Sequence, residues 1–372
     1  MDASISPSIL SRILDLTVKI QQIPAPTFAE GQRAEYLRAQ FLAEGLSDVT
    51  CDTVGNVYAR LEGNGSAAPV VISAHLDTVF PASTDLSVQR NAERIAGPGI
   101  GDNSLGVAGL LGLIWTFREQ GVSLPGDLWL VANVCEEGLG DLRGMRAVVD
   151  RFSDQVLAYL ILEGLALGHI YHRGLGVQRF RITVNTTGGH SWVDYGRPSA
   201  VHELAALVTR LAALPLSAEP RTTLNVGTIG GGTSINTIAA EAHLELDLRS
   251  EGEQALSDLA AQVRALVQAA NQPAVQVDAE VIGTRPTGKL SANHALVRLA
   301  RRRLEEQGYQ PTLGIGSTDA NIPLSRGLPA ICLGLSSGGG SHTLGEYILT
   351  EPLPDGLTYV ASVIEGAFRE LA

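Results

Sequence analysis

Histidine and acidic residues follow several apolar runs in this sequence. The segment "VVISAHLDTV", residues 70–79, begins as an apolar run and ends on His75 and Asp77. A short run rich in β-branched residues is typical of a strand buried on both faces of a sheet. Groups of the same kind occur at four other strand ends or turns: Asp102 in "GPGIGDNSLG", Glu136 and Glu137 in "VCEEG", Glu163 in "LILEG", and His342 in "GGGSHTLGE". Imidazole and carboxylate groups are ligands of divalent cations, so the pattern predicts a metal site.

Each of these groups, taken alone, has an ordinary structural explanation. A lone His-x-Asp is more often incidental polarity than a ligand, and an aspartate in a glycine-rich loop is usually a turn or cap residue. Paired glutamates usually belong to a solvated face, and Glu163 alone would be an exposed strand-end carboxylate. Glu136 and Glu137, however, directly follow a buried strand, where two carboxylates repel each other unless a cation or a proton intervenes. Since every group lies at a strand end, we favour one shared site.

The ligand types indicate which metals suit such a site. Two histidines and three carboxylates without a thiolate favour Zn, Co or Mn, whereas Ca prefers oxygen ligands alone. Five ligands are too many for one tetrahedral zinc ion with an open position, but one shared carboxylate would let them hold two ions. Glu136 then remains as a carboxylate beside the metals, which is what a hydrolase needs as a general base.

The composition is that of a globular protein, with 45% hydrophobic and 18% charged residues. The length of 372 residues predicts two domains or one elaborated domain. The net charge of −12 and the pI near 5.1 disfavour nucleic acid and anionic membranes as partners. Three widely spaced cysteines indicate neither a disulfide framework nor a thiolate metal site. We find neither a signal-peptide pattern nor an apolar run of about 18 residues, and we therefore expect a cytoplasmic protein.

The elements that position the candidate ligands alternate between helices and buried strands. Thr27 is the expected N-cap of the second helix, with Glu30 three residues further on. The expected helices are residues 8–22, 27–46 and 106–121, and the expected strands are a pair within 49–63 and single strands within 68–79, 126–138 and 158–164. This alternation predicts an α/β sheet that binds ligands at the carboxyl ends of its strands.

The pattern changes near residue 175, where strands begin to alternate apolar and polar residues as in a sheet with one wet face. The order there is strand 176–191, helix 198–214, strands 221–232 and 240–250, helix 252–270 and strand 274–282. That β-α-β-β-α-β order predicts a ferredoxin-like domain of roughly 110 residues. The α/β pattern then resumes with a helix at 293–307, the strand "AICLGL" and a helix from about 355. We therefore predict a catalytic domain formed by residues 1–174 and 285–372, with residues 175–284 inserted.

The sequence resembles the dinuclear zinc exopeptidases and deacylases. This family includes glutamate carboxypeptidase, acetylornithine deacetylase, succinyl-diaminopimelate desuccinylase and the peptidase T tripeptidases. The resemblance extends over nearly the whole chain and rests on these motifs: "IPAPTFAEGQRAEYL", "HLDTV", "GIGDNSLGVAGLL", "CEEGLGDLRG", "GGHS" and "SHTLGE". It implies a mixed sheet sandwiched by helices, with an inserted lid and dimerisation domain of the ferredoxin-like type.

The resemblance also implies roles for the candidate ligands. His75 and Glu163 would bind one zinc ion, Glu137 and His342 would bind the other, and Asp102 would bridge both.

Two further roles, and one backbone feature, follow from the same resemblance. Asp77 would hydrogen-bond the ring of His75, and Glu136 would deprotonate the bridging water and pass the proton to the leaving nitrogen. A cis peptide would join Asp102 to Asn103.

Three residues of the inserted domain match substrate-contacting positions of the family. His190 in "GGHS" would reach the neighbouring subunit's site and stabilise the oxyanion, and Asn236 in "GGTSINTIAA" would contact substrate. Arg249 in "LDLRS" would bind a substrate carboxylate. The structural alternatives are a turn residue for His190 and a surface ion pair for Arg249. Asp319 in "GSTDANI" resembles part of a substrate-contacting turn but receives no role.

We therefore expect a metal-dependent hydrolase that cleaves an amide bond of a small peptide as an exopeptidase. It should bind two divalent ions per chain, most simply Zn. We also expect a homodimer formed through the inserted domain. The alternative on the same site is a deacylase of N-acyl amino acids. Two other possibilities are a non-catalytic relative that keeps the fold for binding, and an enzyme in which one metal site fills only weakly. The intact Glu136 and the five intact ligands argue against the non-catalytic relative.

Overall fold

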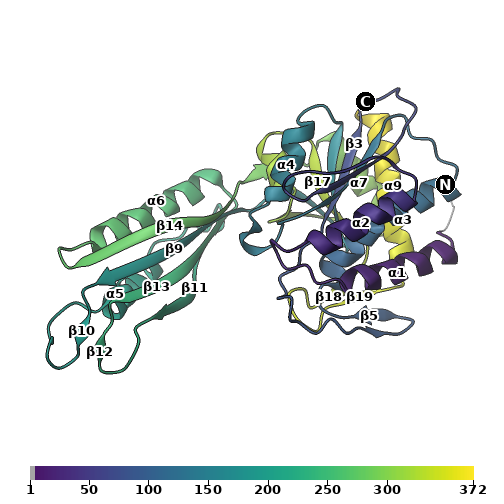
Figure 1. The fold of residues 1–372 in the computed structure, drawn as a ribbon. Coiled ribbons are helices and arrows are strands. Elements are labelled where there is room, and N and C mark those ends of the chain that lie inside the picture. Colours follow the sequence, from purple (N-terminus) through teal and green to yellow (C-terminus); the bar gives the residue numbers. More distant parts are fainter. Residues whose placement is uncertain (1–4) are drawn as a thin grey trace. The chain divides into compact units, whose positions relative to one another are not determined.

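The protein is described by a computed structural model, which covers residues 5–372 (Figure 1). The chain divides into two compact units. Unit 1 runs to Gly174 and resumes at Gly288, and unit 2 comprises Leu175–Thr287. The second boundary lies a few residues after the one expected from sequence, because the last strand of unit 2 continues to Arg285 instead of ending at residue 282.

Unit 1 is built around a mixed sheet with the strand order β1-β2-β6-β3-β7-β17-β8-β15, and β16 pairs with β8. The strands of this sheet are β1 (Ser47–Cys51), β2 (Val57–Leu61), β3 (Val70–His75), β6 (Leu128–Asn133), β7 (Ala158–Glu163), β8 (His169–Gly174), β15 (Gly288–Lys289), β16 (Thr312–Gly316) and β17 (Ala330–Gly334). A smaller sheet contains β4 (Gln89–Arg90), β5 (Arg94–Ala96), β18 (Gly338–Gly339) and β19 (Tyr347–Leu349).

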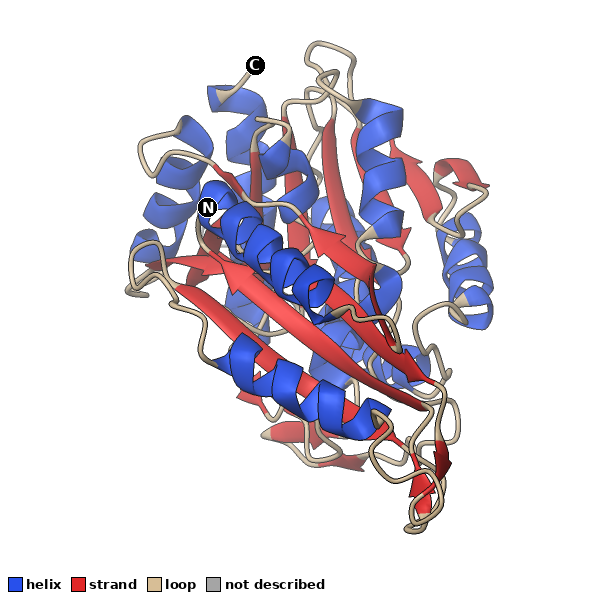
Figure 2. Cartoon of the chain, turned by 90° about the vertical axis from the view of Figure 1, so that its left-hand side faces the viewer, coloured by secondary structure: helices blue, strands red, loops and turns tan. Residues whose placement is uncertain are grey.

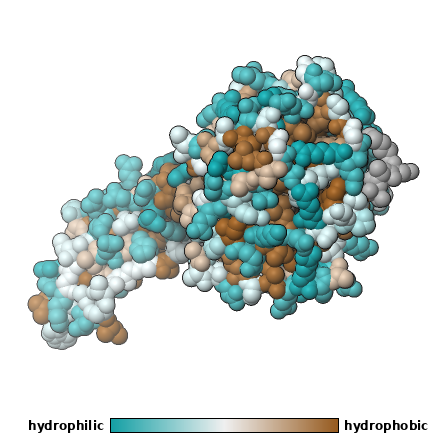
Figure 3. Space-filling model, turned by 45° about the vertical axis from the view of Figure 1, so that its right-hand side comes forward, coloured by the Kyte–Doolittle hydropathy of each residue, from teal (hydrophilic) through white to brown (hydrophobic). Residues whose placement is uncertain are grey.

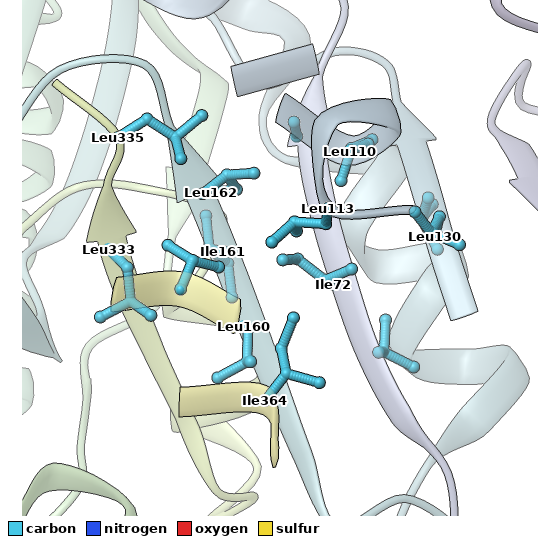
Figure 4. Close-up of a cluster of buried hydrophobic side chains, with 14 of the residues drawn as sticks. Ile72, Leu110, Leu113, Leu130, Leu160, Ile161, Leu162, Leu333, Leu335 and Ile364 are labelled. Carbon is cyan, nitrogen blue, oxygen red and sulfur yellow. The ribbon is translucent and has the colours of Figure 1, made fainter. Parts of the chain in front are cut away.

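The centre of the large sheet consists of the parallel strands β6, β3, β7 and β17. Their residues are almost all buried, as expected for strands that helices cover on both faces. Figure 4 shows side chains of these strands gathered with those of helices α3 and α9 in one apolar core. The α/β sheet expected from the apolar runs is therefore confirmed.

Helices lie on both sides of this sheet (Figures 1 and 2). They are α1 (Pro7–Gln21), α2 (Gly31–Ala43), α3 (Gly106–Glu119), α4 (Arg143–Phe152), α7 (Ala295–Glu306), α8 (Asn321–Ser325) and α9 (Leu353–Glu370), with the short turns η1 (Ile100–Leu105) and η2 (Gly138–Gly140). Within residues 5–372, the stretch Ile100–Glu119 is long and apolar enough to cross a membrane, but 94% of its apolar window is buried inside the protein. That burial is the ordinary state of a core helix.

The expected cap of the second helix is wrong. Helix α2 begins at Gly31, and its N-cap is Glu30, which makes no side-chain cap bond. Thr27 instead donates its hydroxyl to Asp77 Oδ2 at 2.9 Å. The hydroxyl is therefore used by the segment that follows β3 rather than by the helix.

Unit 2 has the element order expected from the sequence and a core of its own. Its main sheet has the antiparallel order β11-β13-β9-β14, which is the ferredoxin-like arrangement. The elements are β9 (Gly176–Thr186), β10 (Gly189–His190), α5 (Ala200–Ala212), β11 (Thr222–Gly231), β12 (Thr237–Ile238), β13 (Glu241–Ser250), α6 (Glu253–Ala270) and β14 (Val275–Arg285). Along β13 every second residue is buried, because one face of the sheet packs against α5 and α6.

Candidate metal centre

The carboxyl ends of the parallel strands bring the first candidate ligands together. His75 is the last residue of β3, and Glu163 is the last residue of β7, which pairs with β3. Glu136 and Glu137 follow β6, the other neighbour of β3. Parallel strands end at one edge of a sheet, so their order alone places these groups near one another.

Two further ligands arrive from loops. Asp102 lies in η1, directly before α3, and His342 lies in the turn between β18 and β19. The peptide bond between Asp102 and Asn103 is cis, as the family resemblance implies.

Asp102 faces both histidines. Its Oδ1 lies 3.1 Å from His75 Nε2, and its Oδ2 lies 3.2 Å from His342 Nε2. Glu163 Oε2 is 3.7 Å from His75 Nε2, and Glu137 Oε1 is 3.1 Å from His342 Nε2. The five side chains thus form two potential metal-binding groups that share Asp102, one with His75 and Glu163 and the other with Glu137 and His342.

Glu136 belongs to a third group, together with His75 and Glu137. Within each group the potential ligand atoms all lie within 4.8 Å of one another. His75 is 2% exposed, and Glu136 and Glu137 are each 6% exposed. Buried carboxylates this close together require positive charge among them.

The electrostatics of the cluster favour a cation. Burial lowers the pKa of His75, but its contacts with the surrounding carboxylates outweigh this effect and raise the pKa well above its usual value. Hydrogen bonds to Asp102 and Glu137 raise the pKa of His342 to about 10, against the opposing effect of burial. Burial alone raises the pKa of Asp102, yet the two histidines lower it overall. Both imidazoles therefore hold protons strongly in this arrangement, and a bound metal ion would replace those protons as the source of positive charge.

The donor set fits transition metals. Imidazole nitrogens and carboxylate oxygens without thiolates match the preferences of Zn, Co and Mn. The ring of His75 is already oriented for such binding, since its Nδ1 lies 3.1 Å from the main-chain carbonyl oxygen of Asp77 and its Nε2 faces Asp102 and Glu163. An Nδ1–H donated to a carbonyl leaves Nε2 as the ligand atom.

Asp77 contacts more of the site than the sequence indicates. Its carboxylate Oδ1 is 3.5 Å from His75 Nδ1, so the shorter contact of the ring is with the main chain of Asp77. The carboxylate also accepts the backbone N–H groups of Glu136 and Glu137, each at 2.9 Å. Asp77 therefore fixes the position of the glutamate pair as well as that of the imidazole.

Sequence reasoning misses two buried charged residues behind Asp77. Glu30 accepts the backbone N–H of Cys135 at 3.0 Å and so fixes the residue before the glutamate pair. Arg33 donates to the carbonyl oxygens of Ile23 and Leu76, and it is 2% exposed. Burial lowers the pKa of Arg33 to about 10, while the charges of Asp77 and Glu30 oppose this decrease. The sequence contains no motif or spacing that indicates these roles, because both side chains bind main-chain atoms.

Glu346 and Asn103 hold the segment that carries Asp102. Glu346 is fully buried and accepts the backbone N–H groups of Gly99, Gly101 and Asp102. Burial raises the pKa of Glu346 to about 7. Asn103 accepts the N–H of Gly164 at 2.9 Å and thereby links this segment to the end of β7. Both residues lie inside quoted motifs, "SHTLGE" and "GDNSLG", which is the only signal the sequence offers for them.

Asp319, to which the sequence assigns no role, is fully buried and accepts an amide N–H of Asn133 at 2.7 Å. Burial raises its pKa to about 7. Asn133 ends β6, so Asp319 belongs to the layer of side chains beneath the metal centre.

Unit 2 brings two of its three candidate residues together. His190 in β10 pairs with Thr237 in β12, and Ser191 N–H donates to the carbonyl oxygen of Asn236 at 3.0 Å. Both His190 and Asn236 are exposed.

Arg249 lies elsewhere in unit 2. It pairs with Thr223 near the far end of β13, whereas the other end of β13 adjoins Gly231 and the β10–β12 pair. At roughly 3.3 Å per residue, the two ends of β13 are separated by about 25 Å or more. Arg249 Nε donates to Asp247 Oδ2 at 2.6 Å, so its guanidinium has a carboxylate partner within the strand.

Comparison with known protein families matches residues 71–366 to Peptidase family M20/M25/M40. The matched range includes all five candidate metal ligands. Succinyl-diaminopimelate desuccinylase of Corynebacterium glutamicum is 23% identical over 382 aligned residues, which cover 100% of both chains.

Solved structures share the fold. A tripeptidase of Staphylococcus aureus superposes with a TM-score of 0.81 at 21% identity, covering 99% of this chain and 100% of that one. A dinuclear metal-binding peptidase of the M20 family from Bacillus subtilis gives a TM-score of 0.71 at 16% identity, covering 98% and 100%.

Proposed function

The chain belongs to Peptidase family M20/M25/M40, whose members hydrolyse amide bonds with the help of metal ions, and we propose that it is a dinuclear metalloexopeptidase of small peptides. The observation that carries this proposal is the position of Asp102, whose two carboxylate oxygens face different histidines. Two ions that share Asp102 would each have one histidine and one further carboxylate. Zinc is the metal we propose, with cobalt and manganese as substitutes.

Glu136 is proposed as the general base. The bound ions would polarise the scissile carbonyl and increase the acidity of the attacking water. Glu136 accepts the proton of that water and delivers it to the leaving nitrogen. Asp77 supports both steps, because its carboxylate holds the main chain of Glu136 and Glu137 and its own main chain orients His75.

His190 is proposed to stabilise the oxyanion. Its Nδ1 accepts the backbone N–H groups of Trp192 and Val193 at 3.2 and 3.3 Å. A neutral imidazole that accepts at Nδ1 carries its proton on Nε2. The exposed edge of the ring therefore presents an N–H donor, which is the group that an oxyanion requires.

Asn236 is proposed to contact the substrate beside His190, and Arg249 to bind a substrate carboxylate. A small peptide cannot span the length of β13, so His190 and Arg249 of one chain cannot both contact the same substrate. We therefore propose a homodimer formed through unit 2, in which each substrate meets His190 of one chain and Arg249 of the other. A cytoplasmic location is part of the same proposal.

Deacylation of N-acyl amino acids is the second candidate function. The full-length similarity to a succinyl-diaminopimelate desuccinylase favours it. The two solved structures reported above are both peptidases, and their likeness in fold supports the first function. The metal groups and Glu136 would serve both reactions in the same way.

Metal removal tests the proposal. Dialysis against a chelator should abolish hydrolysis of a panel of dipeptides, tripeptides and N-acyl amino acids, and zinc or cobalt should restore it. Metal analysis of the restored enzyme should give about two ions per chain, because two groups share Asp102. Full activity of a metal-free preparation would end the proposal.

A matched pair of histidine variants controls for general damage. His342→Ala removes one ligand of the second group and should lower the metal content towards one ion per chain. His243→Ala changes an exposed histidine on β13 of unit 2 and should leave metal content and activity unchanged.

The substrate panel distinguishes the two candidate functions. Hydrolysis of peptides but not of N-acyl amino acids would select the exopeptidase over the deacylase.

A further inference from the structure

One end of unit 2 exposes large apolar side chains to solvent. Trp192 is 85% exposed, Val193 75%, Tyr195 88% and Ile235 103%. These four residues, which we call the apolar tip, lie on two segments joined by the β10–β12 pair and by the Ser191–Asn236 hydrogen bond. Figure 3 shows apolar atoms exposed at this end of the unit, where Figure 1 labels β10 and β12. Clustered exposed apolar side chains on a soluble protein indicate a binding surface.

The turn that displays the apolar tip is held by polar contacts. Asp194 accepts the backbone N–H of His190 at 2.8 Å and forms an ion pair with Arg197 at 2.9 Å. Gly189 permits this arrangement, because a Cβ there would lie 2.7 Å from Asp194 Oδ2. His190 Nδ1 accepts the N–H groups of Trp192 and Val193, the residues whose side chains are exposed. The apolar tip is therefore presented by a defined turn.

Charge at this end of the unit is internally balanced. Apart from His190, the segments 188–198 and 230–239 contain two side chains that carry a full charge near neutral pH, Asp194 and Arg197, and these pair with each other. A charged ligand group buried here would lose hydration without finding an opposite charge. An apolar group would gain from the same burial.

We propose that the apolar tip is the subsite for a large apolar side chain next to the scissile amide, so that the preferred substrates are peptides with Leu, Met, Phe or similar residues at that position. The inference rests on the proposed function, because it is His190 and Asn236 that link the apolar tip to the amide. Trp192 lies two residues from His190, a span of at most about 7 Å. If His190 contacts the oxyanion, a substrate side chain next to the scissile bond lies within about 7 Å of His190, and therefore within reach of Trp192.

Substrate and protein side chains should be varied together. Trp192→Ala and Tyr195→Ala should each lower kcat/KM for Leu-Gly-Gly, Phe-Gly-Gly, Gly-Gly-Leu or Gly-Gly-Phe by about 10-fold or more, mainly through KM. The loss should occur for peptides with the apolar residue on one side of the scissile bond only. The same variants should change kcat/KM for Ala-Gly-Gly and Gly-Gly-Ala by no more than about 3-fold.

Leu216→Ala is the matched control. Leu216 is an apolar residue of unit 2 that is 44% exposed and precedes β11, whose first residue pairs at the far end of β13 from the apolar tip. This variant should leave kcat/KM unchanged for every substrate. An equal loss on every substrate, or dissociation of the tip variants into monomers in sedimentation experiments, would overturn the subsite and assign the apolar tip to subunit contact.

A binding experiment separates the subsite from the proposed reaction. Trp115 and Trp129 lie in unit 1 and are buried or partly buried, so Trp192 is the solvent-exposed tryptophan of the chain. Adding L-leucine or L-phenylalanine to the metal-loaded protein should shift its tryptophan emission to shorter wavelength, whereas L-glutamate should not. The shift should be lost in Trp192→Phe and kept in Glu136→Gln. Failure of catalysis with the shift intact would refute the proposed function alone, and no shift with leucine or phenylalanine would refute the subsite.

Discussion

Glu136 and Glu137 are neighbours in sequence, yet their proposed roles differ. The backbone N–H groups of both are held by Asp77 at 2.9 Å, which fixes the two residues on one short segment. Glu137 Oε1 is 3.1 Å from His342, so it belongs to the ligand group that contains Asp102. Glu136 groups with His75 and Glu137 and is absent from both groups that share Asp102. We therefore propose that Glu137 holds a metal ion and that Glu136 acts as the base beside it.

This difference gives a prediction at the scale of the residue. Glu136→Gln should keep close to two ions per chain and lose about 10²- to 10⁴-fold in kcat, because an amide cannot accept the proton of the water. Glu137→Gln should instead lower metal content, because it removes a ligand of the second ion. Metal analysis and steady-state kinetics on the same preparations distinguish the two variants. Equal metal loss in both, without a selective loss of turnover in Glu136→Gln, would show that the roles are wrongly assigned.

At the scale of the element, the end of β3 is held from behind by α2. The guanidinium of Arg33 is buried and donates to the carbonyl oxygens of Ile23 and Leu76. Leu76 lies between His75 and Asp77, so this contact joins the helix to the segment that positions the first ligand. The positive charge of Arg33 also offsets the negative charges of Asp77 and Glu30, which are buried nearby.

Arg33→Met should therefore destabilise unit 1 by about 3 kcal/mol or more, because buried carbonyls lose their donors and buried carboxylates lose their counter-charge. Arg38→Met is the control on the same helix. Arg38 pairs with Glu35 on the exposed face, and its loss should leave the free energy of unfolding nearly unchanged. Urea unfolding followed by tryptophan fluorescence in a Trp192→Phe background reports on unit 1, because the remaining Trp115 and Trp129 both lie there. A loss of stability in Arg38→Met as large as in Arg33→Met would refute the special role of Arg33.

The elements also explain what the sequence can predict about the site. Each candidate ligand ends or follows an apolar strand or lies in a short motif, so local patterns are sufficient to find it. Glu30, Arg33 and Glu346 act instead on main-chain atoms that are distant in sequence, as in the bond from Gly99 to Glu346 across 247 positions. Nothing in periodicity or spacing indicates such contacts. The wrong cap assignment for Thr27 has the same cause, because its hydroxyl is used by Asp77, 50 positions away.

At the scale of the whole molecule, the change from buried strands to alternating strands near residue 175 predicts the insertion of one unit into another. Unit 2 has its own sheet and its own core, which is why its element order is readable as an independent fold. How a residue of unit 2 serves a reaction at the metal centre is a question about the assembly, and a mixed dimer addresses it.

If His190 completes the partner's site, homodimers of His190→Ala and of Glu136→Ala are each inactive, but for different reasons. Mixing and re-equilibrating them should give about half heterodimers in a two-fold assembly. Within each heterodimer one site carries both lesions, and the other combines an intact Glu136 with an intact His190 from the other chain. About a quarter of all sites should then work, and activity should rise to about a quarter of wild type as exchange proceeds.

The opposite geometry predicts a different time course. If His190 serves the site of its own chain, no arrangement of the mixed dimer contains a complete site, and activity stays at the sum of the two parents. Mixing His190→Ala with wild type at the same ratio is the control for the exchange itself. Heterodimer formation is measured independently by native mass spectrometry with one variant isotopically labelled. Complete exchange without recovered activity would therefore reject the shared site and leave the metal chemistry of Asp102 and Glu136 intact, because neither the ligand groups nor the base depends on the second chain.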